Sequence, residues 1–356
     1  MSYNNELVRF KNRGYVFKEL ITNNERQRME LANACGMTKM TISKIVSDFL
    51  EKDIVVETSK SSGEDGKCGR KASILSLSPG AKKIVGLLIR HEYVSAALCD
   101  CQLNVIRAET VRFTECDMDF LINTIYELVD RIIEDREVWG IGVGSIGPVD
   151  AENGMILNPP GFYGLKNIPI VKLLKKRYEV PVYLDYHYNS AARAEKYFGY
   201  GRNYKNFLLL GVTEGLGLAC VVDGKILSRM TGTSSEFGHI TIDRNGRKCS
   251  CGSRGCIGRY VEFTSEQGTW QAVKDLCAAL LGVCNLLNPH AIIVRDQLSC
   301  LNKEHLRWMQ EDLSTKLSMS EYHKIEVLLS KLNDKLEVTN CAANILGRLF
   351  SGDIEI

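Results

Sequence analysis

The 356-residue sequence has no long hydrophobic run. Its longest apolar stretches, such as 84–89 and 291–294, fall far short of the ~18 residues that a membrane-spanning helix requires, and residues 1–10 are too polar for a signal peptide. Proline is also scarce, with 7 residues, and there is no collagen-like, low-complexity or repeated segment. These absences predict a cytoplasmic chain without a membrane partner, folded over most of its length.

The sequence also has little excess charge of either sign. Its 45 basic and 43 acidic residues leave a net charge of +2, so overall charge does not mark a nucleic-acid or membrane binder. The small basic excess lies within residues 1–80. The 13 cysteines are an odd, unevenly spread set, which in a cytoplasmic chain is typical of buried thiols and a metal site rather than of a disulfide framework.

The N-terminal part has the pattern of a small helical domain followed by a hairpin. Apolar spacing predicts three helices, with Gly36 ending the second and Thr38 as the N-cap of the third. Two β-prone runs then flank a glycine-rich loop and could pair as a wing. The predicted helices cover 16–21, 29–35 and 38–50. The predicted strands cover 54–57 and 72–77, and the loop between them covers 58–69.

The third predicted helix carries polar and cationic side chains on the face away from its apolar stripe. Thr38, Lys39, Thr41 and Lys44 lie on that face, after a short turn. A helix that enters the major groove of DNA needs such side chains for base edges and phosphates. We therefore predict DNA binding through these four residues, with Arg70 of the wing loop reaching a minor groove. A small helical bundle with a solvated face is the alternative.

From about residue 82 the sequence alternates strands with helices in two similar cycles. This order is typical of an α/β or α+β fold, and the similarity of the cycles suggests a duplication. The predicted strands are 84–90, 94–99, 105–113, 139–143, 181–184, 207–212, 217–222 and 291–294, and the predicted helices are 119–134 and 270–287.

Four side chains within residues 239–256 have the spacing of a metal site. His239 is followed by Cys249, Cys251 and Cys256. Three thiolates and one imidazole predict a closed tetrahedral Zn²⁺ site, and because protein atoms fill all four positions the zinc would be structural. Buried cysteines without a metal are the alternative, which the charged residues between these cysteines disfavour.

The same segment resembles a family signature. Glu236-Phe-Gly-His, followed by Cys-x-Cys-Gly-x-x-Gly-Cys256, is similar to the signature of the ROK family, which comprises repressors, open reading frames and sugar kinases. The N-terminal helices, Gly69-Arg-Lys, the glycine-rich segment 140–150 and Asn158-Pro-Pro-Gly resemble the repressor branch of that family.

The resemblance implies an α/β chain with a winged helix-turn-helix at residues 1–80 and a two-lobed, actin-like sugar-kinase domain at 81–356. It implies a transcriptional regulator of sugar genes, a repressor, that binds operator DNA as a homodimer or homotetramer. It also implies a monosaccharide effector in the kinase-like domain. The effector-binding residues carried over from the family positions are Asn158, His187, Glu236 and His239.

The residues that a kinase of this family needs are changed. The resemblance places His187 at the catalytic aspartate and Tyr186 at a sugar-binding asparagine. The first phosphate motif aligns with residues 88–92, which lack its carboxylate and glycines, and the second contains Glu214, whose charge repels phosphate. Residues 295–296 replace a glycine pair near the adenine. We therefore predict that the protein is not an enzyme; an ATP-dependent hexose kinase is the alternative.

The sequence leaves sugar recognition open. The glutamate expected two residues after the last zinc cysteine is Gly258, and a buried hydroxyl left unpaired costs about 1–3 kcal/mol. The pocket is therefore either vestigial or adapted to another ligand, with Tyr186, His187 and Tyr188 as an aromatic, partly polar surface. His187 is as typical of a hydrogen-bonded core histidine as of a ligand contact. A regulator that answers to a protein partner is a third hypothesis.

Overall fold

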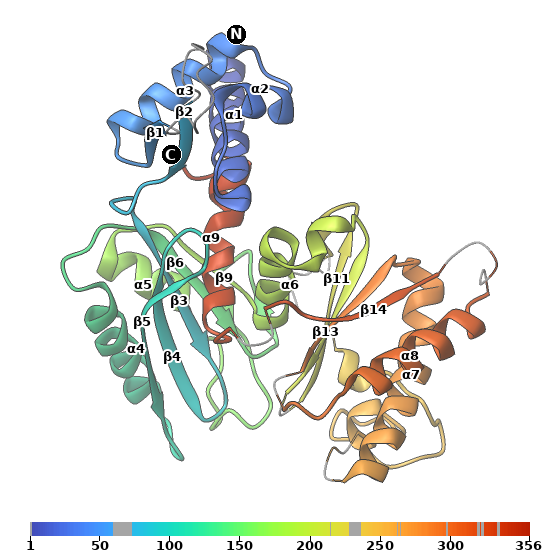
Figure 1. Ribbon diagram of the computed structural model, residues 1–356. Coiled ribbons are helices and arrows are strands. Elements are labelled where there is room, and N and C mark those ends of the chain that lie inside the picture. Colours follow the sequence, from blue (N-terminus) through green and yellow to red (C-terminus); the bar gives the residue numbers. More distant parts are fainter. Residues whose placement is uncertain are drawn as a thin grey trace. The chain divides into compact units, whose positions relative to one another are not determined.

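The structure is a computed structural model, drawn in Figure 1. It describes residues 2–59, 73–213, 215–227, 236–261, 263, 265–296, 298–318, 321, 324–332 and 335–356. Arg70 and Glu214, both singled out in the sequence, lie outside the described residues. The chain divides into two compact units, the first comprising Met1–Val143, Pro169–Leu184 and Cys341–Ile356 and the second Gly144–Ile168 and Asp185–Asn340.

The N-terminal part of the first unit is a winged helix-turn-helix. The apolar stripes of its three helices meet in one core, in which Phe17, Leu31 and Phe49 are fully buried. Gly36 ends α2 with φ +64°, a left-handed conformation that glycine adopts at little cost. The elements are α1 (Ser2–Asn23), α2 (Arg28–Cys35), α3 (Lys39–Glu51), β1 (Val55–Ser59) and β2 (Ser73–Leu77), the two strands pairing antiparallel.

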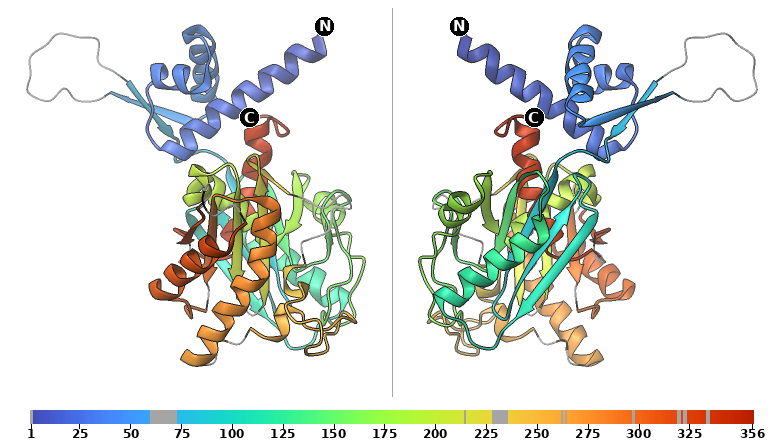
Figure 2. Two further views of the ribbon diagram at one scale, coloured as in Figure 1. Left: turned by 90° about the vertical axis from the view of Figure 1, so that its right-hand side faces the viewer. Right: turned by 90° about the vertical axis from the view of Figure 1, so that its left-hand side faces the viewer.

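The three predicted helices and the paired wing strands are thus confirmed. Helix α1, however, begins fourteen residues before its predicted start, and its N-terminal half extends past the other helices (Figure 2). Leu7 and Val8 are exposed there, so this half of α1 carries no apolar stripe that would have predicted it.

The first unit also contains a five-stranded sheet in the order β5-β4-β3-β6-β9. Helix α4 packs against β3, β4 and β5. These elements are β3 (Lys83–Ile89), β4 (Tyr93–Cys99), β5 (Val105–Arg112), α4 (Met118–Ile133), β6 (Val138–Ser145), α5 (Ile170–Tyr178), β9 (Val182–Tyr186) and α9 (Thr339–Ser351), with β7 (Val149–Asp150) and β8 (Met155–Ile156) as a separate hairpin of the second unit.

The second unit repeats this strand arrangement, with its own sheet in the order β12-β11-β10-β13-β14. In each sheet three consecutive strands form one side and two later strands form the other, as expected for a duplicated, actin-like fold. The elements are α6 (His187–Phe198), η1 (Tyr200–Asn203), β10 (Phe207–Val212), β11 (Leu216–Val222), β12 (Lys225–Ile226), η2 (Phe237–His239), η3 (Ile257–Arg259), α7 (Glu266–Leu287), β13 (Ala291–Asp296), α8 (Lys303–Lys316) and β14 (Glu326–Leu329).

Helix α7 is, among the described helices, the one that is long and apolar enough to cross a membrane by composition alone. Val273, Leu276 and Leu280 on one of its faces are buried in the core of the second unit, together with Leu208 and Leu210 of β10. The most apolar window of α7 is 39% buried, and a helix that packs in a core can have the composition of a membrane span.

Candidate functional site

Helix α3 begins with the capping arrangement that its sequence predicts. The Thr38 side-chain oxygen accepts a hydrogen bond from the Thr41 backbone amide at 3.2 Å, and the two threonine hydroxyl oxygens lie 2.9 Å apart. An N-cap of this type contributes about 1 kcal/mol to a helix. Thr38 therefore fixes the start of α3, while its hydroxyl and that of Thr41 are hydrogen-bonded to each other.

The exposed face at the start of α3 is cationic. Lys39 and Lys44 are exposed, and neither forms an ion pair within the part of the chain that the structure describes. The acidic residue of this helix that lies one turn further on, Asp48, is paired with the nearly buried Arg13 and, at 3.6 Å, with Lys52. The N-terminal half of α3 consequently presents positive charge, as a helix that approaches phosphate requires.

One residue of this face was missed by the sequence reasoning, which looked for polar side chains only. Met40 is 82% exposed. At 100° per residue it lies with Lys44 and Ser47 directly opposite the buried stripe of Ile42 and Phe49. A helical-wheel projection centred on the apolar stripe could have found it.

The four predicted metal ligands come together in the second unit. One ligand atom from each of His239, Cys249, Cys251 and Cys256 lies within 4.8 Å of all the others. The Cys249 Sγ is 3.4 Å from the His239 Nδ1, and the Cys251 Sγ is 3.6 Å from the Cys256 Sγ. Tetrahedral zinc with bonds of about 2.0–2.3 Å holds its ligand atoms roughly 3.5–3.8 Å apart. The cluster thus fits a metal ion of this size.

Local structure holds these ligands in place. The backbone amide of Cys251 lies close to the Cys249 sulfur and lowers the pKa of that thiol to about 6, so that it is a thiolate, the ligand form, at neutral pH. Phe237 and Ile257, next to the first and last ligands, are buried in the core of the second unit. His239 directs Nδ1 to the cluster, which leaves its Nε2 for another partner.

Tyr188 fills the glycine loop that aligns with the second phosphate motif. A Cβ atom added to Gly211 or to Gly217 would lie 1.8 Å from the Tyr188 ring, so these glycines make room for the ring. The Tyr188 hydroxyl oxygen lies 2.9 Å from the Thr213 Oγ1 and donates to the Gly215 carbonyl at 3.3 Å. The side chain is 4% exposed. The loop therefore encloses a tyrosine in this structure.

Arg295, which replaces a glycine in the alignment near the adenine, is also buried, at 2% exposure. Its guanidinium donates to the Asn340 side-chain oxygen at 3.0 Å and to the Lys335 carbonyl at 2.9 Å. Nearby, Glu195 is fully buried and accepts from the Ser330 hydroxyl and the Tyr200 amide, and burial raises the pKa of this carboxyl. The charged groups of Arg295 and Glu195 are thus both hydrogen-bonded inside the second unit.

His187 is a buried, hydrogen-bonded histidine. Its Nδ1 lies 2.8 Å from the Glu337 Oε1. The centre of its ring lies 4.0 Å from that of Tyr188, in a tilted contact, and 4.9 Å from that of Tyr186, in an edge-to-face contact. The hypothesis of a satisfied core histidine fits these contacts. A ligand at this position would have to displace or share the bond to Glu337.

The other predicted effector residues lie on loops of the same unit. Asn158 and Glu236 are exposed, and Glu236 immediately precedes η2. At Gly258 an added Cβ would lie 3.0 Å from the Gly238 carbonyl oxygen, which leaves little room for the glutamate of the family pattern. The grouping of Asn158, His187, Glu236 and His239 around one ligand stays a prediction.

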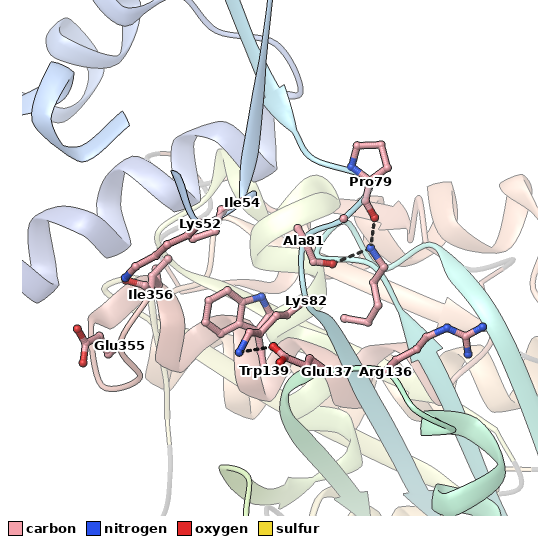
Figure 3. Close-up of a pocket in the computed structure, with 12 residues that line it drawn as sticks. Lys52, Ile54, Pro79, Ala81, Lys82, Arg136, Glu137, Trp139, Glu355 and Ile356 are labelled. Atoms are coloured by element: carbon pink, nitrogen blue, oxygen red, sulfur yellow. Dashed lines mark hydrogen bonds and ion pairs between the residues drawn. The ribbon is translucent and has the colours of Figure 1, made fainter. Parts of the chain in front are cut away.

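A cavity of about 690 Å³ lies in the first unit where the winged helix-turn-helix meets the sheet (Figure 3). Lys83, in its wall, donates to the carbonyl oxygens of Pro79 and Ala81 at 2.6 and 2.7 Å. Lys82 forms an ion pair with Glu137 at 2.8 Å. These bonds fix the connection between β2 and β3, and the cavity belongs to the junction between the winged helix-turn-helix and the sheet.

The profile of the ROK family matches residues 84–278, more than half of the chain. The chain belongs to the ROK family. A xylose repressor from Caldicellulosiruptor bescii is 23% identical to it over 98% of this chain and 98% of its own length.

Two solved structures extend the comparison. A ROK family transcriptional regulator, described as a homologue of the Escherichia coli Mlc protein, matches with a TM-score of 0.80 at 21% identity and covers 97% of this chain and 98% of that chain. A ROK family glucokinase from Streptomyces griseus, in complex with glucose and AMPPNP, gives a TM-score of 0.63 at 21% identity and covers 73% of this chain and 98% of its own. The regulator shares the fold over nearly the whole chain, the glucokinase over about three quarters.

Proposed function

We propose that this ROK protein is a DNA-binding transcriptional repressor of sugar-metabolism genes. Residues 1–80 would bind operator DNA, and residues 81–356 would sense a ligand or partner and hold the oligomer. The observation that carries the proposal is the exposed, cationic start of α3 in a winged helix-turn-helix. The repressor relative that spans 98% of this chain supports it. Binding to operator DNA would place the protein in the cytoplasm.

The test is selection of genomic DNA fragments by the purified protein, followed by titration of the selected fragment. A Lys39/Thr41/Lys44 triple alanine variant should lose specific binding, and Lys44→Ala alone should lower the salt slope by about one unit if Lys44 contacts a phosphate. A control variant removes Lys172 and Lys176, exposed cations of α5, and should bind as the wild type does. Unchanged operator affinity in the triple variant would exclude α3 from the interface.

Arg70, in the wing loop, would add a minor-groove contact. Arginine is favoured in narrow, A·T-rich minor grooves. Arg70→Ala should therefore weaken binding most for operators with an A·T-rich segment beside the half-site. An equal loss on all operators would indicate a phosphate contact instead.

The effector is proposed to be a neutral monosaccharide bound by Asn158, His187, Glu236 and His239. Its affinity should be modest, because His187 is already bonded to Glu337 and little room for a carboxylate remains at Gly258. Thermal-shift screening of a sugar library, followed by operator titration with each hit, tests both binding and regulation. If no sugar binds, or if a bound sugar leaves operator affinity unchanged, a protein partner becomes the better hypothesis.

The metal is proposed to be one structural Zn²⁺ per chain, held by His239, Cys249, Cys251 and Cys256. It would tie the loop between η2 and η3 to the core of the second unit and would supply no open coordination position. Elemental analysis of the purified protein should find one zinc per chain. The chain is further proposed to form a homodimer or homotetramer, which light scattering after size-exclusion chromatography measures.

A kinase function is disfavoured by the way the nucleotide-side positions are filled. The Tyr188 ring lies against both glycines of the loop that would hold phosphates, and Arg295 is bonded within the unit. A phosphoryl-transfer enzyme needs that loop open to ATP. We expect no hexose-dependent ATP turnover. Phosphorylated sugar above a no-enzyme control, absent with His187→Ala, would overturn this expectation.

A further inference from the structure

Met40, at 82%, has the highest exposed fraction of the large hydrophobic side chains in the part of the chain that the structure describes, just above Leu286 at 81%. It is the second residue of α3, between Lys39 and Thr41. The helix beneath it is firmly anchored, because Ile42, Val46 and Phe49 on the opposite side are fully buried. A flexible apolar side chain is thus presented outward by a rigid helix.

The surroundings of Met40 combine cationic and apolar side chains. A groove of about 410 Å³ separates the start of α3 from the N-terminal half of α1. Its walls include Met40 and Lys44 from α3, and Arg9 and Asn12 from α1. Arg9 and Lys44 form no ion pair within the described residues. Val8 of α1 also lines this groove and is 49% exposed, so a polyanion lying along it would find a cation on each wall and exposed apolar side chains beside them, Met40 being the most exposed.

Duplex DNA offers one apolar group that matches this arrangement. In the major groove thymine is distinguished from the other bases by its 5-methyl group, which apolar side chains contact. Methionine is unbranched and polarizable, so it adapts to a small apolar partner. Because Met40 lies on the outermost line of α3, it reaches furthest toward a base edge when the helix enters the groove.

We propose that Met40 determines operator specificity by packing against the 5-methyl group of one thymine in each half-site. This inference rests on the proposed function, since it requires that α3 is the recognition helix. The inference goes beyond the proposed function because it names the chemical group of the DNA that is recognised, the thymine methyl group, and the side chain that recognises it, Met40. Arg9 and Lys44, on either side, would contact phosphates.

The experiment removes the methyl group from the DNA and the thioether from the protein, separately and together. Each thymine of the selected operator is replaced in turn by deoxyuridine, which keeps the base pair and removes only the methyl group. Wild-type protein should lose roughly fourfold in affinity per half-site at one thymine, the factor that corresponds to burial of one methyl group. Met40→Ala should bind the two DNAs equally, and Met40→Leu should keep most of the preference.

Met29, 46% exposed on α2, provides the matched control. Met29→Ala should retain the full deoxyuridine effect. If every thymine tolerates deoxyuridine, or if Met40→Ala remains sensitive to it, the proposal is wrong. If Met40→Ala instead dissociates the oligomer and leaves the thymine preference intact, this face joins two copies of the chain and the proposal is again wrong. If no sequence is selected at all, the proposed function itself fails and the inference with it.

Discussion

Gly14 lies in the middle of α1 and faces the backbone of α9. A Cβ atom added at this position would lie 2.6 Å from the carbonyl oxygens of both Leu349 and Phe350. These oxygens belong to the backbone of a helix, so they cannot turn aside as the end of a flexible side chain can. Gly14→Ala should therefore push α1 away from α9.

Two opposing terms set the size of the effect. Alanine stabilises a helix interior by about 1 kcal/mol relative to glycine. Overpacking of a close contact costs about 1–3 kcal/mol, and a backbone obstacle belongs at the upper end of that range. The ring of Phe17, 6.1 Å from that of Phe350, would have to shift as well. We expect a net loss of about 2 kcal/mol in the free energy of unfolding of the first unit.

Gly282 supplies the control, because it too lies inside a helix, α7, but no atom lies within 4 Å of an added Cβ. Gly282→Ala should stabilise the protein by about 1 kcal/mol through helix propensity alone. Urea unfolding followed by tryptophan fluorescence measures both variants. Trp139 reports on the α1 side, since its ring lies 6.3 Å from that of Phe17. Equal stabilisation by the two substitutions would refute the contact between α1 and α9.

The same variant bears on regulation. One of the boundaries between the two units falls inside α9, whose first residues Thr339 and Asn340 belong to the second unit and whose remainder belongs to the first; others fall inside β6 and β9. A ligand that binds the second unit can alter α3 only through an element that both units share or contact. Gly14→Ala should therefore keep operator binding but weaken its response to an effector. An unchanged response would exclude α9 as the connection.

Three further predictions concern the metal, the glycine loop and the wing. Cys251→Ser should abolish zinc binding and destabilise the second unit, as seen in elemental analysis and thermal unfolding. Tyr188→Ala should cost about 3–5 kcal/mol because it empties a close-packed space, whereas Tyr188→Phe should cost about 1 kcal/mol for the lost hydroxyl bonds; similar losses would contradict the packing. The Arg28 guanidinium donates to Glu57 and lowers the pKa of that carboxyl below its ordinary 4.5. The stability that this ion pair contributes is therefore present above about pH 4.5 and is lost as the pH falls through the folded-state pKa of Glu57. Glu57→Gln should flatten that part of the acid-unfolding curve.

Features that depend on neighbouring residues in the chain could be predicted from the sequence. The stripe of Ile42, Ile45, Val46, Phe49 and Leu50 predicted α3 and its buried face. The first four side chains are buried, whereas Leu50 is partly exposed. The spacing of the histidine and three cysteines predicted a cluster whose ligand atoms do lie within 4.8 Å of one another. The strand 207–212 has its predicted bounds, because it is a continuous apolar run that pairs on both sides.

Features that depend on distant residues could not be predicted in this way. The N-terminal half of α1 has no apolar stripe, so no periodicity announces it. Met40 is apolar, and a search for polar DNA-contacting residues passes over it. Its exposure follows from its position opposite the buried stripe of α3, which a helical-wheel projection would have shown.

The glycine loop shows most clearly why function is harder to predict than fold. Gly211 and Gly217 resemble a phosphate-binding loop in sequence, yet in the structure they make room for the ring of Tyr188, so the loop sequence alone cannot tell the two apart. What decides is a side chain more than twenty residues earlier, at the start of α6. His187, which the family resemblance places at the catalytic aspartate, is hydrogen-bonded to Glu337. Glu337 lies two residues before α9, the helix that continues into the first unit and packs on α1. A ligand that takes the hydrogen bond of His187 would therefore act beside the start of α9, whose opposite end contacts α1.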